Sequence, residues 1–149
     1  MPYIFHLLLV KSQLLINLFQ QGGKIMAKLT QQIKDLIETN RIAYVATVDQ
    51  NSAPNVSPKS TFSIIDDETF IFAEIMSTRT RENLLRNPKI AIYFYSPERN
   101  LGCQIKGEAE MLNSGELYEE MCEALKYFDR KANYVVKVKV KEVYPWPPR

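Results

Sequence analysis

The chain is organised around residues 77–88, which read Ser-Thr-Arg-Thr-Arg-Glu-Asn-Leu-Leu-Arg-Asn-Pro. They predict a short helix over residues 77–87, with Leu84 and Leu85 turned inward and Asn87-Pro88 ending it. Its first turn gathers hydroxyl and guanidinium groups where a helix already carries unpaired N–H groups and the positive end of its macrodipole. Two interpretations stay open. The turn binds a phosphate, which would accept from all these donors, or it is a solvated basic turn capped by Thr78.

A second polar segment, residues 57–61, lies on a predicted strand over Pro54–Ile65 and reads Ser-Pro-Lys-Ser-Thr. Pro58 removes a ladder donor, so it belongs at a sheet edge or a bulge. This segment is either a bulged edge with a solvated Lys59 or a second binding segment that faces the first. Only one predicted strand separates the two polar segments.

The other elements follow from hydrophobic periodicity. Thr30 is expected to cap a helix over residues 30–39, and Ser114 to cap a later helix with an apolar face. That face comprises Leu117, Met121, Ala124, Leu125 and Phe128; the remaining predicted strands are Ile42–Val48, Thr69–Ala73, Lys89–Tyr95, Gly102–Met111 and Tyr134–Val143. The tail from Tyr144 to Pro148 is expected to lie extended outside the sheet. Six strands with few helices predict a mainly β fold, an antiparallel barrel with helices at its ends.

Composition limits the possible functions. The chain has 149 residues and a net charge of +2, which suits a single domain and argues against a nucleic-acid binder. Its one histidine is His6, so residues 26–149 exclude a Ser-His-Asp or Cys-His nucleophile and a histidine-ligated metal site. Cys103 and Cys122 are too far apart for a CxxC redox pair. Reduced cysteines and a cytoplasmic location are expected, with Cys122 a buried structural thiol.

Residues 1–25 are apolar but interrupted by Lys11, Ser12, Gln13 and Asn17, so they predict neither a membrane span nor a secretory signal. Residues 21–26, Gln-Gly-Gly-Lys-Ile-Met, can be encoded by a purine-rich tract just before an ATG, as a translated ribosome-binding site would be. Residues 1–25 are therefore interpreted as a non-native leader before Met26 or as a genuine arm. Residues 26–149 form the predicted domain.

Three pieces, in order and correctly spaced, carry a family resemblance. They are the hairpin of residues 42–49 and 54–58, the stretch 78–84 followed by Asn87-Pro88-Lys89-Ile90-Ala91, and residues 105–109, Ile-Lys-Gly-Glu-Ala. On these motifs the chain, from about Leu29 to Tyr144, resembles the pyridoxamine 5′-phosphate oxidase-like flavoproteins, the FMN-binding split-barrel family. The implied fold is a six-stranded antiparallel split barrel.

The resemblance also implies a cofactor and a site. FMN would lie in a groove at a homodimer interface, with its phosphate held by Thr78, Arg79, Thr80 and Arg81. Ser57, Pro58, Lys59, Ser60 and Thr61 would line the ribityl chain and the pyrimidine edge of the flavin. Trp146 would cover the flavin from the partner's tail, or simply anchor its own tail on the barrel.

The resemblance implies an FMN-dependent oxidoreductase or electron carrier with a small-molecule or protein electron partner. The tail lacks the arginine-rich substrate motif of true pyridoxamine phosphate oxidases, so vitamin B6 chemistry is not implied. No side chain is assigned a catalytic role, because the flavin supplies the chemistry. The alternatives are a deazaflavin (F420)-dependent reductase and a non-catalytic flavin sensor or store. A haem protein fits less well, since the domain has no histidine for an axial ligand.

Overall fold

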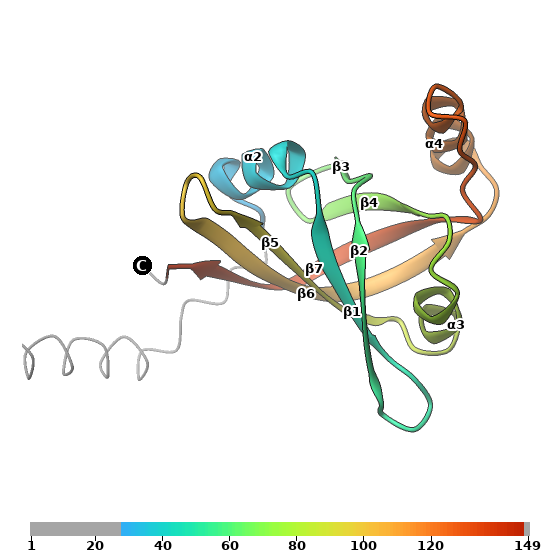
Figure 1. Cartoon of the computed structure of the whole chain (residues 1–149), viewed down its shortest axis with the longest axis horizontal. Helices are drawn as coiled ribbons and strands as arrows, with labels where there is room; N and C mark the ends of the chain where they lie inside the picture. Colours follow the sequence, from blue (N-terminus) through green and yellow to red (C-terminus); the bar gives the residue numbers. More distant parts are fainter. Residues whose placement is uncertain (1–27, 148–149) are drawn as a thin grey trace, which may run out of the picture.

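The structure, a computed structural model, describes residues 28–147, so the predictions for residues 1–25 lie outside it (Figure 1). The described elements are α2 (Gln31–Thr39), β1 (Ala43–Val48), β2 (Pro54–Lys59), β3 (Ser63–Ile64), β4 (Thr69–Glu74), α3 (Thr78–Arg86), β5 (Lys89–Ser96), β6 (Leu101–Leu112), α4 (Glu116–Lys126) and β7 (Tyr134–Trp146). No helix within this range is long and apolar enough to cross a membrane.

The strands form one antiparallel sheet in the order β2-β1-β5-β6-β7-β4-β3. β2 and β3 are its two edges, yet only residues 60–62 separate them in sequence. The sheet must therefore curl until its edges lie close together, which makes a barrel that stays open along one seam. The predicted class, a mainly β antiparallel split barrel, is confirmed.

The number of strands differs from the prediction, because residues 28–147 form seven strands rather than six. The predicted strand 54–65 divides into β2, which pairs with β1, and β3, which pairs with β4. One continuous strand cannot follow partners at opposite edges, so the chain leaves the ladder at residues 60–62. There Thr61 Oγ1 accepts a hydrogen bond from the Ala73 amide at 2.9 Å. Pro58 lies on an edge strand, as its missing N–H predicts.

Aromatic side chains fill the barrel. Phe62, in the short link between the two edges, packs against Phe70, Phe72 and Phe94 with ring centroids 4.9–6.2 Å apart. α2 adds three buried side chains to the same core, Ile33, Leu36 and Ile37. It begins as predicted, with Thr30 Oγ1 accepting from the Ile33 amide at 3.4 Å. The helix thus closes one end of the core with its apolar face.

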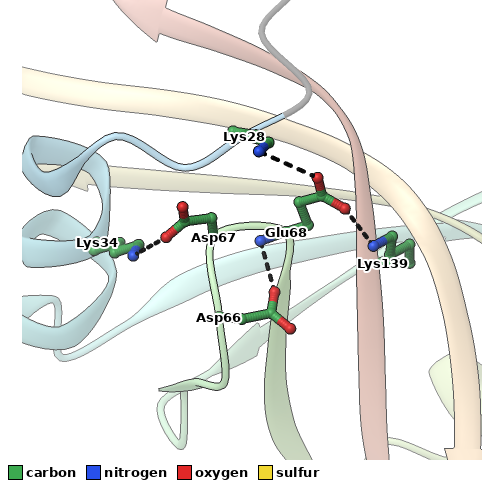
Figure 2. Close-up of polar contacts among 6 residues, drawn as sticks. All are labelled: Lys28, Lys34, Asp66, Asp67, Glu68 and Lys139. Atoms are coloured by element: carbon green, nitrogen blue, oxygen red, sulfur yellow. Dashed lines mark hydrogen bonds and ion pairs between the residues drawn. The ribbon is translucent and has the colours of Figure 1, made fainter.

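An acidic turn joins α2 to the barrel (Figure 2). Lys34 Nζ of α2 lies 2.5 Å from Asp67 Oδ1, and Lys139 Nζ of β7 lies 2.5 Å from Glu68 Oε2. Lys28 also approaches Glu68, at 3.9 Å. Asp66 shapes the turn itself by accepting from the Glu68 amide at 2.7 Å. Three consecutive acidic residues are therefore paired or hydrogen-bonded rather than left to repel one another.

The outer surface over β6 and β7 is charged. Val136, Val138 and Val140 are buried and the intervening lysines face outward, as their alternation predicts. The lysines are paired with neighbouring glutamates at Lys137–Glu110 3.6 Å, Lys141–Glu108 3.4 Å and Lys106–Glu142 3.7 Å. Most of these charges are exposed, so the ion pairs keep this face polar and contribute little to the stability of the fold.

β7 corrects the prediction for the tail, because it continues to Trp146 instead of stopping at Val143. Cys103 pairs with Pro145 and Gly102 with Trp146. β4 pairs with β7 only as far as Lys139, so one side of the later half of β7 carries no neighbouring strand. A proline is tolerated on such a free side, since no ladder donor is needed there.

The outer surface over β2, β1 and β5 is apolar, in contrast to that over β6 and β7. Its large members are 38–62% exposed: Ile42, Tyr44, Val56, Tyr93 and Tyr95. The strand register sets Tyr44 beside both Pro58 and Tyr93, and Ala46 beside both Val56 and Ala91. Lys89, at the start of β5, is the exposed charged residue of this face on that strand. Contiguous apolar surface of this kind is typical of interaction sites.

Both later helices differ in detail from the prediction. In α3 the buried positions are Thr80, Asn83 and Leu84, while Leu85 is 53% exposed, because one face of a short helix cannot hold two adjacent residues equally. α4 is preceded by Gly115 at φ 90° rather than capped by Ser114. Its predicted apolar face is largely open. Leu125 is buried and Phe128 is 68% exposed, because α4 projects away from the barrel (Figure 1).

The two cysteines differ in their surroundings. Cys103 is fully buried, and burial raises the pKa of its thiol to about 12, so it stays protonated and unreactive. Cys122 on α4 is only partly buried, beside Tyr118. The prediction of a buried structural thiol therefore describes Cys103 better than Cys122.

Candidate functional site

The two polar segments singled out in the sequence meet in the structure. On β2, Val56 and Pro58 are exposed, whereas Ser57 and Lys59 turn toward the start of α3. Ser57 Oγ lies 2.8 Å from Thr80 Oγ1, and Lys59 Nζ donates to Ser77 Oγ. These contacts join residues 23 and 18 positions apart in the chain. The segments therefore form one site between the edge of the sheet and the first turn of α3.

A buried carboxylate organises this first turn. Glu74, the last residue of β4, is 0% exposed and accepts from the Ser77 amide at 2.6 Å through Oε1. Its Oε2 lies 3.5 Å from Arg81 NH1 and has no hydrogen-bond partner in the part of the chain that the structure describes. Ser77, not Thr78, precedes the helix, and its hydroxyl makes no capping bond. Glu74 thus serves as the anion that a helix N-terminus favours.

Lys59 is an unusual lysine, because only 8% of it is exposed. Burial lowers the pKa of its ammonium group, and the negative charge of Glu74 partly opposes that shift. The Lys59 ammonium group is thus held by its hydrogen bond to Ser77 Oγ and feels the negative charge of Glu74. The interpretation of Lys59 as a solvated edge lysine is wrong.

Two buried polar residues of α3 attach the helix to the sheet. Thr80 Oγ1 is held by Ser57 and also accepts from Asn55 Nδ2 at 3.1 Å. Asn83 Nδ2 donates to Thr47 Oγ1 of β1 at 3.0 Å. Because their side chains already have partners, these residues fix the position and rotation of α3.

The remaining predicted site residues in the two segments are more open. Thr78 and Arg79 are exposed in the first turn of α3, as are Pro58 and Ser60 around the end of β2. Among the ion pairs of residues 28–147, Arg81 has Glu74 and Arg79 has no counterpart. Arg79 is thus a guanidinium beside the unpaired amides of a helix N-terminus with no acid of its own.

Trp146 lies apart from this cluster. It ends β7 beside Gly102 and is 50% exposed. In Figure 1 the end of β7 and α3 lie at opposite ends of the molecule. Within one chain the structure therefore does not bring Trp146 to the other predicted site residues.

Sequence reasoning missed three members of the cluster, Asn55, Glu74 and Ser77. The signal for Glu74 is its place at the end of Phe70–Ala73, a run with every side chain buried. A lone charged residue that ends such a run is either at the surface or buried with partners. Only the structure distinguishes the two.

A comparison with protein families shows to which family the chain belongs. The family model described as pyridoxamine 5′-phosphate oxidase matches residues 29–147, which is most of the chain and contains the whole site. The chain belongs to the pyridoxamine 5′-phosphate oxidase family. The family assignment made from the sequence motifs is thereby confirmed.

Individual known proteins also resemble the chain over most of its length. An uncharacterised protein of Methanocaldococcus jannaschii is 32% identical over 127 residues, 82% of this chain and 83% of that protein. The crystal structure of HupZ from Group A Streptococcus is 36% identical, covers 79% of this chain and 94% of its own, and has a TM-score of 0.73. An FMN-binding protein of Syntrophomonas wolfei shares the fold at 20% identity, 95% and 97% coverage and a TM-score of 0.69.

Proposed function

We propose that the chain is an FMN-binding flavoprotein that acts as a cytoplasmic oxidoreductase or electron carrier, working as a homodimer. The observation that carries the proposal is the meeting of β2 with the first turn of α3, which leaves Arg79 without an acid of its own. The family membership and the FMN-binding protein among the structural relatives support it.

The donors of this turn suit a phosphate. Arg79 offers a forked guanidinium and Thr78 a hydroxyl, both exposed, next to backbone amides that have no acceptor within the helix. A dianion there would satisfy these groups and complement the macrodipole. The Thr80 hydroxyl is already held by Ser57 and Asn55, so Thr80 would contribute through its backbone amide. Arg81 brings a second positive charge close by.

The β2 segment would hold the rest of the cofactor. Pro58 and Ser60 are exposed, and the chain between β2 and β3 is outside the ladder, so its backbone groups are free to meet a ligand. Ser57, Lys59 and Thr61 keep this backbone in place through their bonds to Thr80, Ser77 and Ala73. When bound, FMN supplies hydride and electron transfer, and the protein supplies binding and orientation.

The apolar outer surface of β2, β1 and β5 supports the homodimer. It carries exposed Tyr44, Val56 and Tyr93, and its one charged side chain on β5 is Lys89 at the start of that strand, so an identical face can meet it about a two-fold axis over mainly apolar side chains. β2 carries site residues on its other face, so a partner there would lie next to the candidate site. Trp146 would reach the flavin only from that partner.

The absorption spectrum of the purified protein, with the chromophore released and identified by mass, tests the proposal. Bands near ~370 and ~450 nm with released FMN are expected, as for ordinary flavins. A single band near ~400–420 nm would indicate a deazaflavin such as F420 in its place. Bleaching by NADH or NADPH would support an oxidoreductase, whereas bound FMN that no donor reduces would indicate a sensor or store. A colourless protein that does not bind added FMN would overturn the proposal.

A further inference from the structure

Three cations lie at the first turn of α3, and they differ in how far they are exposed to solvent. Lys59 is buried, Arg81 is 27% exposed in its side chain, and Arg79 is exposed. The Glu74 carboxylate lies 3.5 Å from Arg81 NH1, and its negative charge also acts on Lys59. Three like charges so close would repel one another, so their arrangement depends on this acid.

Glu74 contacts two groups of the turn, the Ser77 amide and the Arg81 guanidinium, and has no contact with Arg79 among residues 28–147. One oxygen accepts from the Ser77 amide, and the other lies 3.5 Å from Arg81. Lys59 is held on the Ser77 hydroxyl and feels the charge of Glu74. Since Glu74 is wholly buried and Oε2 lacks a hydrogen bond, loss of Arg81 would leave a poorly compensated charge in the interior.

We propose that Glu74 is a positioning residue that determines which cation of the site is free to bind the cofactor. It holds Arg81 and Lys59 in the protein and leaves Arg79 as the guanidinium that binds the phosphate of FMN. This inference rests on the proposed function, and it assigns Arg81 to Glu74 rather than to the cofactor. The pairing also sets the charge of the turn, because Glu74 cancels one of the three cations before a ligand arrives.

The decisive test is a suppression experiment on FMN affinity, followed by quenching of FMN fluorescence. Arg79→Ala is expected to weaken FMN binding by at least ~10-fold, the scale of one charged hydrogen bond. Adding Glu74→Gln to that variant frees Arg81 to turn toward the phosphate. The double variant is expected to bind FMN at least ~5-fold more tightly than Arg79→Ala alone. Glutamine keeps an oxygen for the Ser77 amide, so the helix start is preserved.

Riboflavin, which lacks the phosphate, is the matched control ligand. Its affinity is expected to change less than ~2-fold across these variants, because these charges act only on the phosphate. Arg81→Ala is expected to weaken FMN binding at most ~3-fold. Equal losses from Arg79→Ala and Arg81→Ala, or no recovery on adding Glu74→Gln, would overturn the inference.

Thermal unfolding without cofactor separates this inference from the proposed function. Arg81→Ala is expected to lower the unfolding midpoint, and Glu74→Gln/Arg81→Ala to recover at least half of that loss, because the double variant no longer buries a carboxylate that has lost its guanidinium partner. Additive losses would contradict the pairing whether or not FMN binds. If Arg81→Ala fails to fold, its rescue by Glu74→Gln is read from soluble yield. Failure of the wild-type protein to bind FMN would overturn the proposed function, and with it the role of Arg79, while the unfolding data still decide the pairing.

Discussion

Ser57 and Thr80 share a hydrogen bond of 2.8 Å across the junction between β2 and α3. One belongs to the edge strand and the other to the first turn of the helix, so this bond fixes the distance between the two segments of the candidate site. Asn55 donates to the same Thr80 oxygen at 3.1 Å. The buried Thr80 hydroxyl therefore shapes the site, and the groups that remain available to a ligand lie around it.

Thr80→Val tests this structural role. Valine keeps the shape of the side chain but removes the buried hydroxyl, which leaves Ser57 without its partner and Asn55 with only its 3.4 Å bond to Thr47 Oγ1. The free energy of unfolding is expected to fall by about 1–3 kcal/mol, measured by urea titration. Thr78→Val, at an exposed position two residues earlier, is the control and should change stability by less than about 0.5 kcal/mol. Equal effects at both positions would contradict the assignment.

Arg79→Ala tests the ligand-binding role. It is expected to weaken FMN binding by about 1.5–3 kcal/mol, the worth of a hydrogen bond to a charged group. Arg79 is exposed and has no ion-pair partner within residues 28–147, so stability should stay within about 0.5 kcal/mol of wild type. Arg86→Ala, at the other end of α3, serves as the control. Unchanged FMN affinity in Arg79→Ala would move the phosphate to another part of the protein.

Much of this arrangement is predictable from the sequence. The polar residues of β2 and of α3 stand out by type, and their separation by one strand of an antiparallel fold indicates that they can meet. Glu74 is not predictable, because its burial depends on Arg81 and Ser77 packing over the end of β4. The break in the strand at residues 60–62 is not predictable from the sequence for a similar reason. It follows from the closure of the sheet, and closure is a property of all the strands together.

Local periodicity also fails where a polar partner lies across the core. Leu84 and Leu85 look equally suited to the inner face of α3, but Asn83 occupies part of that face because Thr47 accepts its hydrogen bond. The helix is rotated accordingly, and Leu85 is exposed. A sequence pattern ranks residues by hydrophobicity and contains no record of such a partner.

Charge on the apolar face tests the dimer. Tyr44→Lys and Val56→Lys each place a cation at an exposed position of the apolar face, where the proposed two-fold interface would bury it against the partner. Both variants are expected to be monomers by light scattering at concentrations where the wild type is a dimer. Glu110→Lys, on the charged face over β6 and β7, should leave the wild-type mass unchanged. A wild-type protein that is itself monomeric would contradict the proposal directly.

Acid should weaken the turn that joins α2 to β7. The Lys34 hydrogen bond lowers the pKa of Asp67 from its ordinary 3.8, and the Lys139 hydrogen bond lowers that of Glu68 from 4.5. A carboxyl whose pKa is lower in the folded state stabilises the protein above its unfolded-state pKa and loses that effect as pH falls through the folded value. Asp67→Asn should therefore lower the unfolding midpoint at pH 7 and make no difference well below pH 3.8. The same shift at both pH values would rule out the ion pair as its cause.

Gly107→Ala tests the close contact at the bulge of β6. A Cβ there would lie 2.5 Å from the Lys139 carbonyl oxygen and 3.0 Å from Val138 Cγ1. The register of β6 and β7 shifts between Lys106 and Gly107, so the backbones approach at this point. β6 is bonded on its other side to β5, where Ile90 pairs with Gly107, so it cannot move away without breaking that ladder. Unfolding should become easier by about 1–3 kcal/mol, the range of overpacked cores. Glu108→Ala, whose exposed carboxylate pairs within residues 28–147 only with Lys141, should cost less than about 0.5 kcal/mol. Similar costs for the two variants would mean that the strands can separate at the bulge without loss, and that the glycine is not required for their contact.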